Sequence, residues 1–170
     1  MPILCRVTRG DLTESIHVVF AVAVDETGTV FYSTGDPFYL TCIRSSFKPF
    51  QAAVAVKAGA VDAAGFSDDE LAIMCASHNG EDIHVKTVQS MLNKLGLSIA
   101  DLECGTHFPL DKITQRKMIK DGKNAEPFHN NCSGKHVGML ALAKHLGQGI
   151  KGYIQKEHPV QKEIFNLVNE

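Results

Sequence analysis

A serine and a lysine stand three positions apart in the stretch RSSFKPFQ, residues 44–51. The S-x-x-K spacing is found in serine hydrolases of amide bonds, where the lysine is a candidate base for the serine. On a helix, Ser45 and Lys48 would share one face, which brings the amine within reach of the hydroxyl. The amine acts as a base only when neutral, and burial against Phe47 or a nearby cation such as Arg44 would favour that state. The alternative is a plain helix start, with Ser45 as N-cap and Lys48 in solvent.

A second serine follows an apolar run in the stretch CASHNGED, residues 75–82. The Asn79-Gly80 pair favours a turn there, so Ser77 would be presented at the end of a helix. Ser77 and Asn79 also give the S-x-N spacing that accompanies S-x-x-K in penicillin-binding enzymes, although the third element of that set, K-T-G, does not occur in this sequence. The alternative is a turn that only ends a helix.

A third cluster, HNNCSGKHVGML, spans residues 129–140. If a helix begins near Ser133, Cys132 lies at its N-terminus, where the helix dipole and Lys135 favour a thiolate. A thiolate can bind a soft metal or act as a nucleophile. The alternative is an ordinary buried cysteine beside a capping asparagine. His107, in CGTHFP, is a further candidate, and its alternative is a loop histidine without a role in chemistry.

The elements that would position these residues follow from periodicity and turn signals. Two runs rich in Val and Phe, joined by ETG, predict a β-hairpin over about residues 17–35. Residues 48–59 suit a helix, because Pro49 fits its first turn and Gly59 fits its end. Ser67, with Glu70 three residues later, forms a capping box ahead of an apolar run. The other expected elements are a helix over 82–95, a loop over 96–130 with helical pieces around 114–120, and a helix from 133 to 147.

The last stretch, EHPVQKEIFNLVNE, predicts a helix that starts at Pro159 and ends without a cap or a turn. Its apolar face consists of Val160, Ile164, Leu167 and Val168. A helix with an apolar face normally leads into further structure, so we expect the chain to be a piece of a longer protein that leaves this face exposed. A frayed terminal helix is the alternative.

Composition narrows the class of protein. The chain has 170 residues, enough for one core, and 17 basic against 19 acidic residues, so nucleic acid is not expected as a partner. It has no apolar run of about 20 residues and no signal peptide, so we expect no membrane association and a cytoplasmic location. Its five cysteines form no C-x-x-C pair and are expected to be reduced.

Taken together and in this order, the three motifs resemble those of the rhizobial-type L-asparaginases, the asparaginase II family. GDP, CGTHFP and HPVQ follow the order of that family as well, and the resemblance runs from Glu14 to the end. It implies an α/β fold of the α+β type, in which helices pack on an antiparallel sheet, related to the serine β-lactamases and glutaminases. It also implies hydrolysis of L-asparagine to L-aspartate and ammonia.

The resemblance implies roles for individual residues. Ser45 and Lys48 match the serine–lysine pair of the family, and Ser77 matches a second active-site serine. Cys132 and Lys135 match positions at the zinc site of the family. The residues that match motif positions and are expected to bind substrate are Arg44, Glu81, His107 and His136.

Members of this family are much longer, and their second half supplies another cysteine and an aspartate to the metal and substrate site. Residues 1–170 are therefore expected to be the N-terminal part of a single domain, with no internal boundary. With Cys132 as its one good soft ligand, the chain would bind zinc weakly, and no organic cofactor is expected. In the complete protein we expect a homodimer.

The mechanism that fits these residues is acyl transfer, in which Lys48 takes the proton of Ser45 and the alkoxide attacks the side-chain amide of asparagine. Ser77 would relay protons or orient the substrate, or would itself be the nucleophile, and the sequence leaves these options open. Two other readings are a β-lactamase-like or peptidase-like serine hydrolase, and an inactive half-domain that needs a partner chain.

Overall fold

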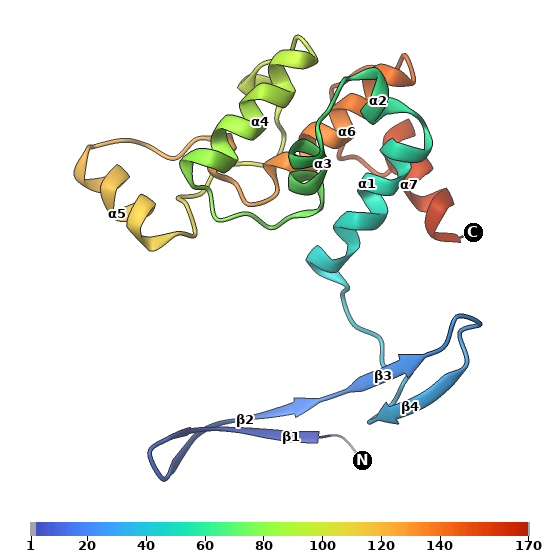
Figure 1. The fold of residues 1–170 in the computed structure, drawn as a ribbon, viewed down its shortest axis with the longest axis vertical. Coiled ribbons are helices and arrows are strands. Elements are labelled where there is room, and N and C mark those ends of the chain that lie inside the picture. The colour runs from blue at the N-terminus through green and yellow to red at the C-terminus, as the bar shows by residue number, and fades with distance from the viewer. Residues whose placement is uncertain (1–2, 170) are drawn as a thin grey trace. The chain divides into compact units, whose positions relative to one another are not determined.

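The computed structural model describes residues 3–169. Within this range every strand precedes every helix along the chain, which confirms the α+β class (Figure 1). The chain divides into two compact units, Met1–Cys42 and Ile43–Glu170. The expected single domain without an internal boundary stays a prediction.

Two antiparallel ribbons form the first unit. β1 (Ile3–Arg9) pairs with β2 (Leu12–Val19), and β3 (Ala21–Val24) pairs with β4 (Val30–Thr34). The predicted hairpin is confirmed for β3 and β4, but the residues before Phe20 pair with β1 instead. Strand β1 was not predicted, because its polar and apolar residues do not stand out as a strand.

Helices and short 3₁₀ turns form the second unit. The helices are α1 (Lys48–Lys57), α2 (Ala60–Ala63), α3 (Asp68–Cys75), α4 (Asp82–Lys94), α5 (Lys112–Lys120), α6 (Ser133–His145) and α7 (Pro159–Asn169), and the 3₁₀ turns are η1 (Arg44–Phe47), η2 (Ile99–Asp101) and η3 (Pro127–His129). The helices predicted from periodicity are confirmed to within a few residues. The four-residue helix α2 was not predicted.

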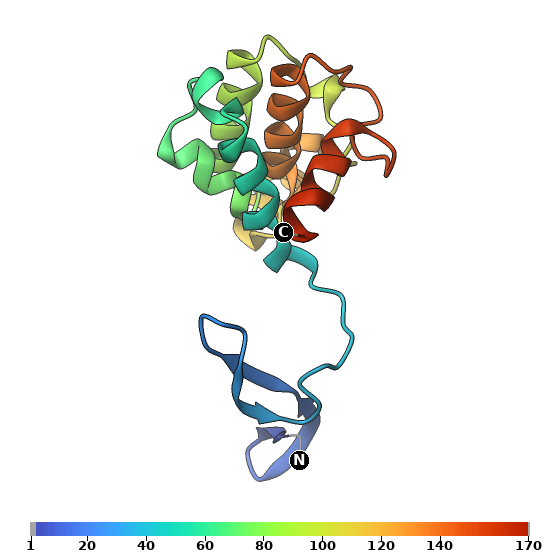
Figure 2. The same cartoon turned by 90° about the vertical axis from the view of Figure 1, so that its right-hand side faces the viewer.

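Helix α6 lies at the centre of the helical unit. Ten of its thirteen residues are buried, and it contacts α1, α2, α3, α4 and α7 (Figure 2). A helix that is apolar on all sides is expected in such a central position. The N-terminal end of α6 is therefore fixed in space, and it carries the cluster around Cys132.

Helices α3 and α6 approach each other closely at two glycines. A Cβ atom added to Gly134 would lie 2.4 Å from the carbonyl oxygen of Ile73, and one added to Gly138 would lie 2.6 Å from Cε of Met74. At Gly134 the neighbouring atoms belong to the backbone, so a side chain there would force α3 to shift, whereas at Gly138 the flexible end of Met74 would have to move. The close approach brings the end of α3, which leads into Ser77, next to the start of α6.

We expect Gly134→Ala to lower the free energy of unfolding by about 1–3 kcal/mol, because the added methyl group must displace the backbone of α3. Urea unfolding followed by circular dichroism measures the change. Gly149→Ala is the matched control, since a Cβ there meets no atom within 4 Å. Equal stability of the two variants would contradict the close packing of α3 on α6.

The predicted capping box at the start of α3 is confirmed. The Ser67 N–H donates to Glu70 Oε2 at 2.8 Å, and the Glu70 N–H donates to Ser67 Oγ at 3.3 Å. The buried Glu70 carboxylate also accepts from Lys94 Nζ at 2.6 Å and from Ser90 Oγ at 2.9 Å. Because Lys94 and Ser90 belong to α4, this one carboxylate joins α3 to α4.

The expectation of a fully exposed apolar face on the last helix is wrong for half of that face. Val160 and Ile164 are buried, because α7 packs against α1 and α6. Leu167 is partly buried against the core, and Val168 is exposed.

Among the residues that the structure describes, no helix combines the length and the apolar character that a membrane span requires.

Candidate functional site

Lys48 is the centre of the candidate site. It is the first residue of α1, and its side chain is buried, with 2% of its surface exposed. Its Nζ atom donates to the carbonyl oxygen of Ala76 at 2.7 Å, to Ser77 Oγ at 2.8 Å and to the carbonyl oxygen of Asn131 at 3.2 Å. These three acceptors match the three N–H donors of a lysine ammonium group.

Two serines continue the hydrogen-bonded path from the lysine. The Ser77 hydroxyl donates to Ser45 Oγ at 2.9 Å, and both serines are exposed. Ser45 lies in η1, one residue into that turn. The spacing of the motif suggested direct contact between Ser45 and Lys48, but the structure connects them through Ser77. The site therefore consists of a buried amine below two hydroxyl groups that face solvent.

The backbone just before Ser45 has an unusual conformation. Arg44 has φ of +51°, in the left-handed region that residues other than glycine adopt at a cost of about 1 kcal/mol or more. Strained backbone of this kind is concentrated at functional sites. Arg44 itself is exposed next to Ser45, and its role in substrate binding stays a prediction.

His78 fixes the turn that carries Ser77. The Gly80 N–H donates to His78 Nδ1 at 3.1 Å, so Nε2 carries the proton and donates to Ser133 Oγ at 2.8 Å. Ser133 Oγ in turn donates to the carbonyl oxygen of Phe128. Burial, followed by the nearby His84 and Lys48, lowers the pKa of His78 to about 4, which keeps the ring neutral.

The residues expected to bind zinc lie at the start of α6. Cys132 is its N-cap, and its thiol donates to Asn131 Oδ1 at 3.4 Å. Burial lowers the pKa of Lys135, although the nearby Cys132 opposes this shift. Cys104 is also close, since Asn130 Nδ2 donates to the Cys104 carbonyl oxygen while Asn130 Oδ1 accepts from the Cys132 N–H. Burial raises the pKa of Cys104 to about 11, so it remains a thiol.

Zinc normally takes four ligands, three of them from protein in catalytic sites. No group of three or more His, Cys, Asp or Glu side chains that would hold a metal occurs within residues 3–169. Cys132 and Lys135 alone do not make up such a set, so this part of the chain does not fit a zinc ion without further ligands.

His136 is held in the core by Tyr153. Its Nδ1 lies 2.8 Å from the Tyr153 hydroxyl, which accepts from the Glu103 N–H and so donates to the ring. Burial, followed by Lys135, lowers the pKa of His136 to about 3. Glu81 is the N-cap of α4, and its N–H donates to His84 Nδ1 at 3.2 Å. Contact of either residue with substrate stays a prediction.

The two buried neutral histidines make stability depend on pH. An unfolded histidine titrates near 6.5, whereas His78 and His136 titrate at about 4 and about 3. Between these values the unfolded chain binds more protons, so the free energy of unfolding falls as the pH drops from 6.5 towards 4, by up to about 1.4 kcal/mol per pH unit and proton.

Urea unfolding at a series of pH values measures this slope. We expect His136→Phe to reduce the slope between pH 6.5 and 4, because one of the two protons is removed. His145→Gln, at an exposed position, is the matched control and should leave the slope unchanged. An unchanged slope in His136→Phe would contradict the neutral buried ring.

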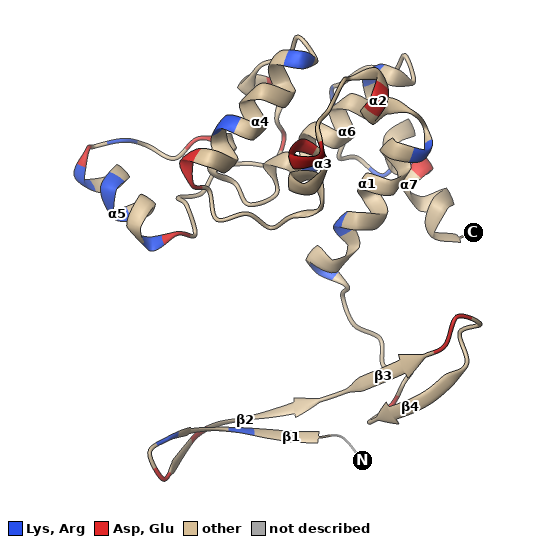
Figure 3. Ribbon diagram, viewed as in Figure 1, with Lys and Arg blue, Asp and Glu red and all other residues tan. Residues whose placement is uncertain are grey.

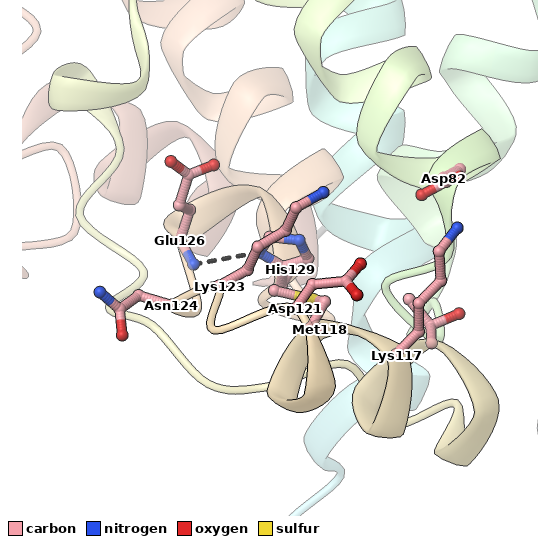
Figure 4. Close-up of a pocket in the computed structure, with 9 residues that line it drawn as sticks. Asp82, Lys117, Met118, Asp121, Lys123, Asn124, Glu126 and His129 are labelled. Carbon is pink, nitrogen blue, oxygen red and sulfur yellow. Dashed lines mark hydrogen bonds between the residues drawn. The ribbon is translucent and has the colours of Figure 1, made fainter.

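A cavity of about 470 Å³ lies away from the serine–lysine site, between α5, the loop after it and the start of α4 (Figure 4). It is lined by Asp82, Thr114, Lys117, Met118, Asp121, Lys123, Asn124, Glu126 and His129. Basic residues recur along α5 (Figure 3). Ser45, Lys48 and Ser77 do not line this cavity, so its size alone does not identify the reactive site.

A buried lysine joined to a serine hydroxyl in a mixed α+β fold is an arrangement that hydrolases of amide bonds use. The family model described as L-asparaginase II matches residues 5–170, and the chain belongs to this family. Membership indicates an amidohydrolase that acts on asparagine. No curated protein gives a significant match to the sequence.

The backbone groups of the site were not predicted from the sequence. The carbonyl oxygens of Ala76 and Asn131 bind Lys48 as directly as Ser77 does. A carbonyl leaves no residue-specific signal, although both residues lie within the motifs that contain Ser77 and Cys132. His78, which holds the turn after Ser77, was likewise part of a motif without an assigned role.

Proposed function

We propose that the chain hydrolyses the side-chain amide of L-asparagine through a serine–lysine acyl-enzyme mechanism. The observation that carries the proposal is the continuous path from buried Lys48 through Ser77 to exposed Ser45. In this proposal the buried Lys48 amine is the base and the exposed Ser45 hydroxyl is the nucleophile. Membership of the L-asparaginase II family supports asparagine as the substrate.

The path works as a proton relay whose direction depends on the lysine. When Lys48 is an ammonium ion, it donates to Ser77, and Ser77 donates to Ser45, which is the arrangement described above. When Lys48 is neutral, two N–H groups stay on the carbonyl oxygens of Ala76 and Asn131, and its lone pair accepts from Ser77. Ser77 then accepts from Ser45, so reversing both bonds carries a proton from Ser45 to Lys48.

The chemistry follows in two stages. Ser45 Oγ attacks the side-chain amide carbon of asparagine while its proton passes to Ser77 and the Ser77 proton passes to Lys48. The Lys48 ammonium returns a proton through Ser77 to the leaving nitrogen, and ammonia departs as the C–N bond breaks. Water then attacks the aspartyl ester of Ser45 with the same base, which releases aspartate. Backbone N–H groups around Ser45 would stabilise the oxyanion.

Full activity, in this proposal, needs residues in addition to those described. Cys132 and Lys135 would hold zinc only together with ligands from outside residues 3–169. The first unit also carries exposed apolar side chains along its strands, such as Leu12 and Phe31, which other polypeptide would cover. A cytoplasmic homodimer without an organic cofactor completes the proposal.

Release of ammonia from L-asparagine tests the function, with L-glutamine and nitrocefin as parallel substrates. We expect turnover with asparagine once the further zinc ligands are supplied, and none with nitrocefin. Nitrocefin hydrolysis would favour a β-lactamase-like enzyme. No turnover by the 170-residue chain, together with association on gel filtration, would favour a half-domain that needs a partner chain, for which the exposed strands of the first unit are the supporting observation.

A further inference from the structure

We propose that His107 is a positioning residue: its ring holds the Asn131 peptide group so that the Asn131 carbonyl oxygen stays on the Lys48 amine. This inference rests on the proposed function for its effect on catalysis. It assigns to His107 a role other than the contact with substrate expected from its motif. The hydrogen bonds of both ring nitrogens carry the argument.

Both ring nitrogens of His107 are engaged within the chain. Nδ1 lies 2.7 Å from the carbonyl oxygen of Phe108, which only accepts, so Nδ1 carries the proton. Nε2 is then the acceptor for the Asn131 N–H at 3.1 Å. Asn131 Oδ1 lies 3.3 Å from Nε2 and 3.4 Å from Cys132 Sγ, and it accepts from the thiol. The neutral ring has no nitrogen left for a substrate.

The other side of the Asn131 residue faces the reactive site. Its carbonyl oxygen accepts from Lys48 Nζ at 3.2 Å and from the His78 N–H at 3.2 Å. The backbone of Asn131 is thus held by His107 at its nitrogen and by Lys48 and His78 at its oxygen. Because His78 directly follows Ser77, the same carbonyl fixes both the base and the turn that carries the relay serine.

The loop that bears His107 is itself anchored to this turn. The Asp111 N–H donates to the Asn79 carbonyl oxygen at 3.1 Å. A Cβ atom on Gly80 would lie 3.1 Å from Cα of Pro109, so the two backbones are in close contact. The imidazole therefore joins Asn131 to a loop that is itself fixed relative to the turn after Ser77.

The position of the Asn131 carbonyl oxygen affects catalysis because this oxygen stabilises the positive charge of protonated Lys48. As Lys48 takes up the proton from Ser77, its charge develops against the Ala76 and Asn131 carbonyl oxygens. A carbonyl that is no longer held would turn away and stabilise this charge less. The loss falls on the transition state and leaves asparagine binding unaffected, so kcat should fall while KM stays the same.

Three variants test the proposal by ammonia release. In His107→Leu, which lacks an acceptor for the Asn131 N–H, we expect kcat to fall about tenfold, with KM unchanged. In His107→Gln, the side-chain oxygen takes the place of Nε2, and kcat should recover most of the loss. His129→Leu is the matched control, because the His129 ring also accepts a backbone N–H, from Glu126 at 3.0 Å, and serves no part of the relay (Figure 4).

Amide hydrogen exchange at Asn131 provides a readout that needs no turnover. His107→Leu should speed this exchange about tenfold, and His107→Gln and His129→Leu should not. A raised KM with unchanged kcat in His107→Leu, or unchanged exchange at Asn131, would overturn the proposal. If the wild-type protein releases no ammonia even with the further zinc ligands supplied, the proposed function fails, and the exchange measurements alone decide the role of His107.

Discussion

Replacing Ser77 with alanine should lower asparagine hydrolysis by about 10³-fold or more, even though Ser45 and Lys48 remain in place. The Ser77 hydroxyl contacts both, at 2.8 Å from Lys48 Nζ and 2.9 Å from Ser45 Oγ. Without it, the lysine has no described route to the proton of Ser45. The same loss is expected for Ser45→Ala and for Lys48→Met.

Steady-state ammonia release measures this effect, and circular dichroism checks that the fold survives. Ser46→Ala is the matched control, since Ser46 is an exposed serine next to Ser45 whose hydroxyl donates only to the Ile43 carbonyl oxygen at 2.7 Å. It should keep near-normal turnover. Near-normal turnover in Ser77→Ala would contradict the proton relay through Ser77. If Ser45→Ala still lost activity, Lys48 would have to activate Ser45 directly.

The second large effect concerns stability, at Glu70. We expect Glu70→Gln to lower the free energy of unfolding by about 2–4 kcal/mol, because the buried carboxylate joins α3 to α4 and accepts from Lys94, Ser90 and Ser67. Burial acts to raise the pKa of Glu70, but the hydrogen bond from Lys94 and those from Ser67 and Ser90 outweigh it and lower the pKa. The charged carboxylate is therefore the form that the fold stabilises.

Urea unfolding at pH 7 measures the change. Asp69→Asn is the matched control, because it removes one carboxylate from the same first turn of α3 at an exposed position. The pKa of Glu70 is lowered in the folded protein. Its contribution to the free energy of unfolding is therefore fully present at pH values above the ordinary pKa of glutamate, and it is lost as the pH falls through the lowered pKa. A Glu70→Gln variant as stable as Asp69→Asn would show that the carboxylate does not hold the two helices together.

Local signals predicted much of the helical unit. The capping box of Ser67 and Glu70, the Pro49 at the start of α1 and the periodicity of α4 each depend on residues within a few positions of one another. The α+β class and the family also followed from the order of short motifs. The two β-ribbons were harder to predict, because the composition of β1 does not reveal that it pairs with β2, nor in which register.

The sequence singled out the side chains of the candidate site, but it did not predict the hydrogen bonds that connect them. Spacing suggested that Ser45 and Lys48 meet on one helical face, but Ser45 lies in the 3₁₀ turn before α1. The long side chain of Lys48 instead reaches the segment after α3. Its partners are mainly backbone carbonyls, whose positions depend on how α3 packs on α6. Tertiary packing of this kind cannot be deduced from the spacing of residues along the chain.

The hydrogen bond from Lys48 to the Asn131 carbonyl oxygen also determines when, during protein synthesis, the Lys48 amine can be buried. Lys48 reaches partners 28, 29 and 83 residues further along the chain. Until Asn131 leaves the ribosome, burial of the amine lacks one acceptor and costs free energy, so the start of α1 remains hydrated. A nascent chain that stops before this residue holds both serines and the lysine but not the complete set of Lys48 acceptors, so the proposed hydrolytic chemistry would begin only after α6 has docked.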